Sequence, residues 1–232
     1  MKKELETDAI HNLLWGGLRE RILAEQINAH TPRDVRNILD VGCGDGYLLH
    51  ILQKNSSKDI KYYGLDQSLT RLKRVLEKIP LVKNTLGEIT LLPFRNNSFD
   101  VVICSEVLEH VLKYRTALQE LLRITKKYVI ITVPYDQELV KIICPKCEYE
   151  HFLSGHIHRF TKKSIIKDVK QYPHTKIKKL TPFYTIYTYN NMTFYFPQWI
   201  RYTLDRCVTS LATMIPFFKG NYIIIILEKN NP

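Results

Sequence analysis

Apolar residues recur along this chain at two spacings, one typical of helices and the other typical of buried strands. Between residues 4 and 29 they return every three or four positions, which predicts a helix that ends before Pro32. The same spacing predicts further helices over 47–54, 67–79, 114–124, 161–172 and 198–215. Short continuous apolar runs predict strands over 37–41, 61–66, 98–106, 127–134, 176–183 and 221–229.

These strands and helices alternate along the chain, and the strands are apolar at nearly every position. Strands of that kind are buried on both faces, and helical connections between them make neighbouring strands parallel. With 232 residues, the chain is long enough for one sizeable core. We therefore expect a single α/β domain over 1–232, with a mostly parallel sheet, in which 1–30 form an N-terminal helical cap.

The composition is that of an ordinary folded protein with an uneven excess of positive charge. Hydrophobic residues make up 45% and charged residues 25% of the chain, which argues against a disordered or fibrous protein. The formal net charge is +11, and residues 113–179 hold 15 Lys and Arg against 6 Asp and Glu. Such a surface attracts nucleic acid, anionic lipid or a phosphate-bearing small molecule, or simply keeps the protein in solution.

The sequence carries no pattern of export or of a membrane span. Its first residues, MKKELETDAIHNLLWGG, lack the apolar core and cleavage site of a secretory signal. Its longest apolar run, Tyr222 to Leu227, is far shorter than the roughly 20 residues that cross a bilayer. The five cysteines are an odd number, and only Cys144 and Cys147 are close together, which favours reduced thiols. We therefore expect a cytoplasmic protein.

Three glycines follow the first predicted strand at the spacing G-x-G-x-G: Gly42, Gly44 and Gly46. Without side chains they let the backbone turn sharply and approach a ligand closely. Asp66 ends the next strand, where a carboxylate can accept hydrogen bonds from two ribose hydroxyls. Structural turns also use glycine, so the combination with Asp40 and Asp66 is what indicates a nucleoside site.

Five segments, in order, resemble the class I S-adenosylmethionine-dependent methyltransferases, in particular their small-molecule, type 11-like group. They are ILDVGCGDGYLL, YYGLDQS, LGEITLLPF, SFDVVICSEVLEHV and KKYVIITVP, and they run from about residue 37 to 134. The resemblance implies a Rossmann-like, doubly wound sheet of seven strands, with the last strand antiparallel. It also implies S-adenosylmethionine as the cofactor.

The resemblance assigns cofactor contacts residue by residue. It implies that Asp40, Gly42, Cys43, Gly44 and Gly46 surround the methionine part, Asp66 binds the ribose, Gln67 and Glu88 flank the adenine, and Ser105 and Glu106 line the sulfonium. Glu109 and His110 belong to the same family motif, or merely begin a helix.

The cofactor's sulfonium makes its methyl group a good electrophile, so catalysis can rest largely on alignment. A hydroxyl acceptor would also need a base, and His110, His156 and His158 are the candidates by residue type, with His110 and His158 our choice. The fourth strand runs into CSEVLEH, which lacks the Asn/Asp-Pro-Pro-aromatic motif of base-modifying enzymes and the Pro-Cys nucleophile of RNA cytosine enzymes. The chain resembles instead the enzymes that act on small molecules, quinones, lipids and sugars.

The stretch CPKCEYEHFLSGHIHRF, residues 144–160, holds two cysteines and three histidines and belongs to an insertion over 134–160 above the active site. We expect four of them to bind a tetrahedral zinc: Cys144, Cys147, His151 and His156. The pattern resembles an insertion in a subset of these methyltransferases, although Glu148 stands where that insertion usually has Gly. A metal-free loop, or direct base catalysis by a histidine, is the alternative.

Aromatic residues gather over 182–202, where they would line a sugar- or lipid-like acceptor, stack on single-stranded nucleic acid, or fill the core. The amphipathic segment 198–218 would rest on a membrane surface or pack as a last helix. We expect methyl transfer to a small molecule, or to a glycan or lipid precursor that carries phosphate, at an oxygen. An RNA or protein acceptor is the alternative within the enzyme class, and a non-catalytic, zinc-stabilised binding protein is the alternative outside it.

Overall fold

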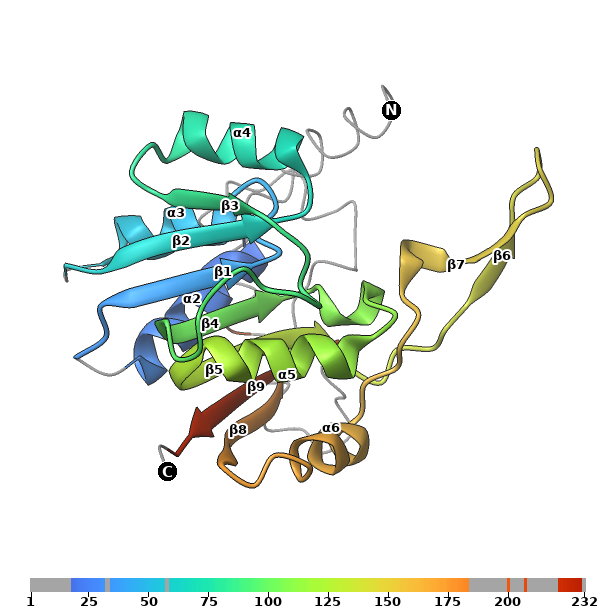
Figure 1. The fold of residues 1–232 in the computed structure, drawn as a ribbon. Coiled ribbons are helices and arrows are strands. Elements are labelled where there is room, and N and C mark those ends of the chain that lie inside the picture. Colours follow the sequence, from blue (N-terminus) through green and yellow to red (C-terminus); the bar gives the residue numbers. More distant parts are fainter. Residues whose placement is uncertain are drawn as a thin grey trace.

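A computed structural model describes residues 18–31, 34–56, 59–183, 200, 207 and 221–230. Seven strands form one sheet in the order β3-β2-β1-β4-β5-β9-β8 (Figure 1). Their bounds are β1 Asn37–Val41, β2 Lys61–Asp66, β3 Lys83–Leu86, β4 Phe99–Ser105, β5 Thr125–Pro134, β8 Thr175–Phe183 and β9 Tyr222–Lys229. Only β9 runs antiparallel to its neighbours in this sheet. The expected Rossmann-like sheet, mostly parallel with an antiparallel last strand, is confirmed.

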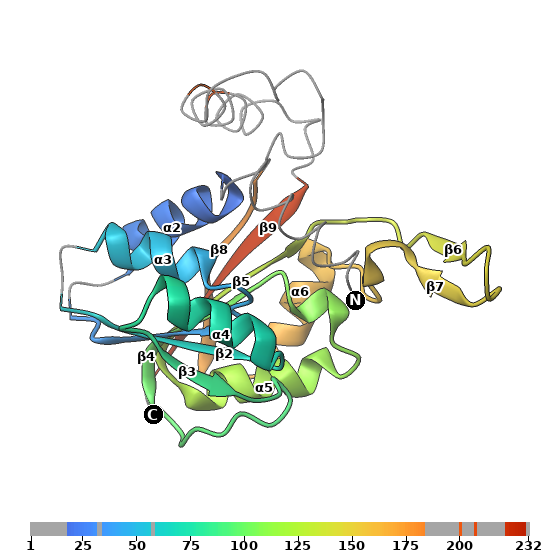
Figure 2. The same cartoon turned by 90° about the horizontal axis from the view of Figure 1, so that it is seen from above.

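Helices cover both faces of the sheet, as Figure 2 shows. One face carries α2 Leu18–His30, α3 Tyr47–Lys54 and α4 Leu69–Lys78, and the other carries α5 Tyr114–Ile124 and α6 Lys162–Val169. Successive strand residues point to opposite faces, so in β1 Ile38 packs with the first group and Leu39 with the second. The continuous apolar runs of the strands are therefore explained by two buried faces.

Side-chain caps begin two of the helices. Ser68 caps α4, because its side chain accepts a hydrogen bond from the Arg71 backbone N–H. Thr161 and Ser164 form a capping box that begins α6. The helix ends at Val169, earlier than the predicted 172. Residues 1–17, and 184–220 apart from Ile200 and Cys207, lie outside the described residues. Most of the predicted N-terminal cap, the aromatic stretch 182–202 and the last helix therefore lie outside them too.

Four short elements were not predicted, and neither was the 3₁₀ turn that follows β7. They are β3, the two strands β6 Lys141–Ile143 and β7 Glu150–Phe152, and the 3₁₀ turn η1 Leu108–His110. The strands β6 and β7 pair with each other and form a hairpin that projects away from the main sheet (Figures 1 and 2). A second 3₁₀ turn, η2 Leu153–Gly155, brings the chain back from the hairpin. No helix in the described part of the chain is long and apolar enough to cross a membrane.

Candidate active site

A cavity of about 580 Å³ lies beyond the carboxyl ends of β1, β2 and β4, where the order of the sheet reverses. Ligands of open α/β sheets bind at such a reversal, and the volume is within the range of small-molecule sites, roughly 300–1,000 Å³. Predicted residues that line this cavity are Gly42, Asp66, Gln67, Glu88, Glu106 and His110.

The turn after β1 requires glycine for two separate reasons at Gly42. The residue has φ +76°, a backbone conformation that side chains disfavour. A Cβ at this position would also lie within 3.0 Å of Val107 Cγ2, closer than Cβ atoms pack. The Gly42 and Cys43 N–H groups both donate to Leu65 O, at 2.7 and 3.0 Å, which ties the turn to the end of β2. The cavity wall is therefore formed by bare backbone held in one position.

Asp66 is fixed at the floor of the cavity by the backbone around it. Its side chain is only 5% exposed, and its two oxygens accept from the N–H groups of Gly44, at 2.9 Å, and Ser68, at 2.8 Å. Each carboxylate oxygen can accept a second hydrogen bond. The carboxylate can therefore receive hydroxyl donors from a ligand without giving up the bonds that orient it.

Other predicted cofactor residues do not line the cavity. Asp40 is buried in β1, and Gly44 and Gly46 belong to the turn without reaching the cavity surface. Burial, with Asp40 and Asp66 nearby, raises the pKa of the Cys43 thiol, so this side chain is neutral. Ser105 shares a hydrogen bond of 2.9 Å with the Thr132 hydroxyl on β5 and is likewise outside the cavity lining.

The cavity also has lining residues that the sequence did not point to, among them Arg71, Val107 and Leu112. For Arg71, the sequence signal that could have indicated a place at the cavity is its position in the first turn of α4, three residues after the Ser68 cap. Asp66, Glu88 and Glu106 contribute carboxylates against the one guanidinium of Arg71 among the described lining residues. This local excess of negative charge suits a cationic ligand.

The segment that returns from the hairpin is docked onto η1 at the edge of the cavity. His110 Nδ1 lies 3.1 Å from Gly155 O, and the Ile157 N–H donates to Glu109 O at 2.9 Å. One ligand atom from each of Glu109, His110 and His156 lies within 4.8 Å of the others. Burial and the proximity of His110 lower the pKa of His156, so its ring is neutral at neutral pH.

His158, one of the two predicted bases, lies beside the cavity and not in its lining. Its Nε2 donates to Val111 O at 2.9 Å, and its ring packs edge-on against Tyr114, with centroids 4.6 Å apart. Because a carbonyl can only accept, Nε2 carries a proton and only Nδ1 could act as a base. His110 is the predicted base that does line the cavity.

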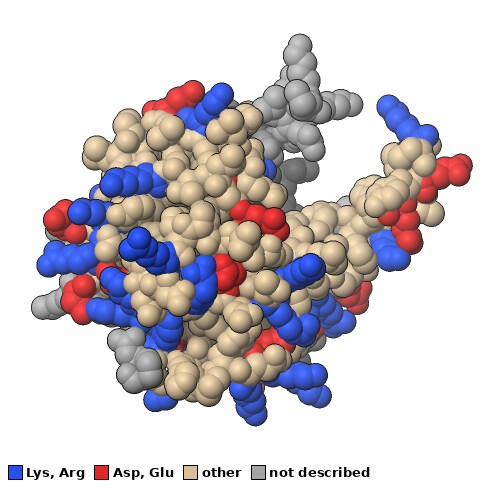
Figure 3. Space-filling model, in the orientation of Figure 1, with Lys and Arg blue, Asp and Glu red and all other residues tan. Residues whose placement is uncertain are grey.

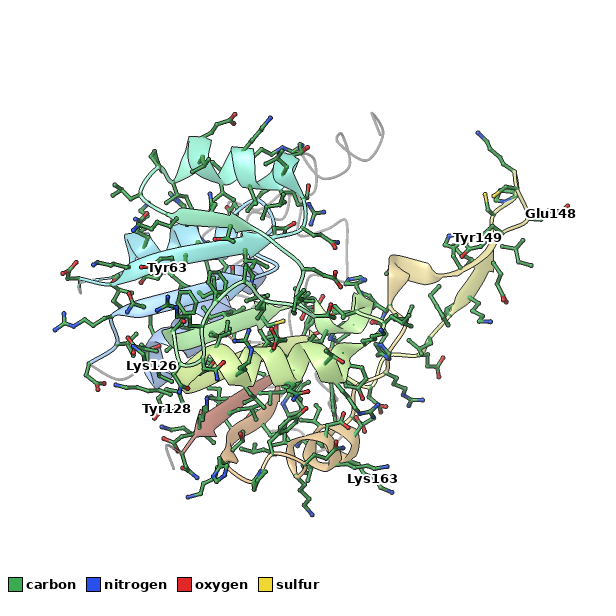
Figure 4. The ribbon with its side chains drawn as sticks, viewed as in Figure 1. Tyr63, Lys126, Tyr128, Glu148, Tyr149 and Lys163 are labelled. Atoms are coloured by element: carbon green, nitrogen blue, oxygen red, sulfur yellow. The ribbon has the colours of Figure 1, made fainter. Side chains whose placement is uncertain are left out.

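The predicted zinc ligands are not brought together. Cys144 and Cys147 lie in the turn of the β6–β7 hairpin, next to Glu148 and Tyr149 at the tip labelled in Figure 4. Hydrogen bonds from the backbone of Lys146 and Cys147 and from the Cys147 thiol lower the pKa of Cys144. Glu148, at the place where the related insertion has Gly, has φ +56°, the left-handed conformation that favours glycine.

The other two predicted ligands lie apart from the cysteine pair. The His151 ring stacks with Tyr149, whereas His156 is carried back to η1. Within the described ranges, the group of three or more potential ligands that the fold assembles is Glu109, His110 and His156. The structure therefore does not bring Cys144, Cys147, His151 and His156 together, because the hairpin separates the cysteines from the end of the insertion, and the four-ligand zinc site stays a prediction.

Residues 39–132 match the family described as "Methyltransferase domain". An uncharacterized protein of Methanocaldococcus jannaschii is 40% identical over 102 residues, which cover 43% of this chain and 41% of that protein. An uncharacterized methyltransferase of Schizosaccharomyces pombe is 33% identical over 130 residues, which cover 50% of this chain and 45% of that protein. The matches thus span less than half of the length of these relatives.

Among solved structures, the fold is similar to a SAM-dependent methyltransferase from Aquifex aeolicus. The TM-score is 0.60 at 15% identity, and the superposition covers 96% of this chain and 97% of that one. At this identity the similarity speaks for the fold, and it extends over nearly the whole chain.

Proposed function

We propose that residues 39–132, which match the family described as "Methyltransferase domain", form a class I S-adenosylmethionine-dependent methyltransferase domain, and that the protein transfers the methyl group of S-adenosylmethionine to an acceptor. The observation that carries the proposal is the cavity between the Gly42 turn and the fixed carboxylate of Asp66. A bare turn and an acid at the end of the next strand are what a nucleoside ligand needs.

The lining residues have distinct tasks in this proposal. Asp66 accepts hydrogen bonds from the ribose hydroxyls through the lone pairs that its backbone donors leave. Glu88, exposed at the cavity edge, faces the adenine, and Glu106 lies on the side of the cationic sulfonium. The charge of the sulfonium disappears as the methyl group leaves, so alignment of the acceptor is the main catalytic requirement.

We further infer that the acceptor is a small molecule, or a glycan or lipid precursor, methylated at an oxygen. Val111 and Leu112 also line the cavity, next to His110, and offer apolar contacts to a compact acceptor. Residues 113–179 hold 15 Lys and Arg against 6 Asp and Glu, and Lys and Arg side chains project from many points of the face shown in Figure 3. Outside the acidic cavity, this excess of positive charge favours an acceptor that carries phosphate. An RNA acceptor would instead make binding fall steeply with salt concentration.

The test is calorimetric titration of the full chain with S-adenosylmethionine and S-adenosylhomocysteine. Asp66→Ala should weaken S-adenosylhomocysteine binding at least about tenfold, because two charge-assisted hydrogen bonds to the ribose are lost. Asp59→Ala is the matched control, since Asp59 is exposed before the start of β2, away from the cavity lining. Equal affinities for both variants would show that the ribose site is misplaced, and no binding by the unaltered protein would overturn the proposed function.

A further inference from the structure

We propose that Glu109, His110 and His156 bind one divalent transition-metal cation at the edge of the cofactor cavity. Their ligand atoms lie within 4.8 Å of one another, and the two imidazole rings meet edge to face with centroids 4.8 Å apart. Glu109 and His110 come from η1, whereas His156 comes from the end of the insertion, so the group exists only because the chain returns to this point.

The three side chains need only small movements to hold a cation. Bonds of about 2.0–2.2 Å place tetrahedral ligand atoms roughly 3.3 Å apart, which is closer than the present spread. Glu109 is fully buried, and its backbone carbonyl is fixed by the Ile157 N–H. His110 is exposed and His156 partly exposed, so small displacements of the two rings can close the remaining distance.

Both histidines are oriented as metal ligands usually are. The Nδ1 atom of His110 lies 3.1 Å from Gly155 O, and the Nδ1 atom of His156 lies 2.7 Å from Gln137 Oε1. These oxygens can only accept, so each Nδ1 carries the ring proton and each Nε2 keeps its lone pair. An imidazole N–H held by an oxygen acceptor is the arrangement that fixes the tautomer of metal-binding histidines.

The chemistry of the ligands limits which cations the site can bind. Two imidazoles and one carboxylate favour zinc, iron(II), cobalt or nickel over magnesium and calcium, which prefer oxygen ligands. Three protein ligands leave at least one position open, as in catalytic rather than structural zinc sites. The cysteine pair at the hairpin tip does not take part.

The open position gives the cation a role in methyl transfer, and this role rests on the proposed function whereas the binding itself does not. His110 lines the cavity, so a hydroxyl of the acceptor can reach the cation from there. Coordination lowers the pKa of the hydroxyl, and its proton leaves to solvent. The alkoxide oxygen then forms a bond to the methyl carbon while the carbon–sulfur bond breaks, and the electron pair stays on sulfur in S-adenosylhomocysteine.

The experiment titrates metal-stripped full chain with Co²⁺ and Zn²⁺ and measures heat and visible absorption. We expect one cation to bind per chain. His156→Ala and Glu109→Gln each remove a ligand and should weaken binding at least about 100-fold. Gln137→Leu removes only the acceptor of the His156 N–H and should weaken binding about 10- to 100-fold. His151→Ala and the double variant Cys144→Ser/Cys147→Ser should bind as the unaltered protein does. Thermal unfolding of each variant shows that it is folded.

Unchanged binding in His156→Ala would overturn the proposal. So would loss of binding in the cysteine variant, together with a thiolate-to-cobalt charge-transfer band in the unaltered protein, because both place the cation in the hairpin. Titration of the same stripped protein with S-adenosylhomocysteine separates the two proposals. Cofactor binding without cobalt binding defeats the metal site alone, and cobalt binding without cofactor binding defeats the methyltransferase function alone.

Discussion

Gly42→Ala should destabilise the protein more than Gly44→Ala, because only one of the two added methyl groups collides with the fold. Both residues have positive φ, +76° and +54°, so each substitution costs about 1–2 kcal/mol of backbone strain. A Cβ at Gly44 meets nothing within 4 Å, whereas at Gly42 it presses into Val107. Overpacking adds about 1–3 kcal/mol, so we expect a total loss of about 2–5 kcal/mol for Gly42→Ala.

Val107→Ala turns this expectation into a double-mutant cycle. The substitution removes both γ carbons that crowd the new methyl group and leaves the Val107 Cβ at 3.4 Å, an ordinary contact. The double variant Gly42→Ala/Val107→Ala should therefore be more stable than the sum of the two single effects predicts, by about 1–3 kcal/mol. The strain from positive φ is not relieved and should remain.

Urea unfolding of the four proteins, with Gly44→Ala as a fifth, measures these free energies. Single effects that add within about 0.5 kcal/mol would refute the collision as the cause, because independent sites behave in that way. Titration with S-adenosylhomocysteine on the same proteins adds a functional reading, since Gly42 and Val107 both line the cavity. Recovery of affinity in the double variant would place the collision, and not the loss of glycine itself, at the origin of any binding defect.

Two further predictions concern charged side chains that connect elements of the fold. Asp168 on α6 is 4% exposed, and its carboxylate accepts hydrogen bonds from the Tyr114 hydroxyl, at 2.8 Å, and from Arg115 Nε, at 3.0 Å. Asp168→Asn should therefore lower the free energy of unfolding, measured in urea, by about 1–3 kcal/mol. An unchanged value would show that this link does not stabilise the protein. Arg123 lowers the pKa of Glu120, so the ion pair stabilises the protein above the ordinary Glu pKa and this contribution is lost as pH falls through the lowered value. The stability difference between the unaltered protein and Glu120→Gln should therefore shrink in acid, and a difference that stays constant from neutral pH to acid would contradict the pairing.

The elements that the sequence predicted are those whose residue pattern is set by burial alone. The strand over 61–66 and the helices over 47–54 and 114–124 have the bounds that apolar spacing indicates, because burial alone decides their pattern. The strand β3, with the sequence KNTL, is an edge strand that pairs only with β2 and buries no complete face. Without an apolar pattern, nothing in its sequence distinguished it from a loop.

In the candidate site, too, some residues could be predicted from the sequence and others could not. The Gly42 turn and Asp66 were predictable because each stands at the end of a recognisable strand, and parallel strands bring their carboxyl ends together. The predicted zinc ligands are not assembled in this structure, because residues close in sequence are not necessarily close in space. Between Cys147 and His156 the chain completes a hairpin strand and a 3₁₀ turn, which carries the histidine away from the thiols.

The segment 134–160 therefore contacts the edge of the cavity through its last residues and not through its hairpin. β6 and β7 pair with each other and with no strand of the main sheet, so the hairpin forms without help from that sheet. By contrast, Gly155 and Ile157 bond to residues of η1, and these contacts set the position of His156 relative to Glu109 and His110. The Cys-containing tip takes no part in the proposed cation site, so substitutions in the tip should leave the chemistry at the cavity unaltered.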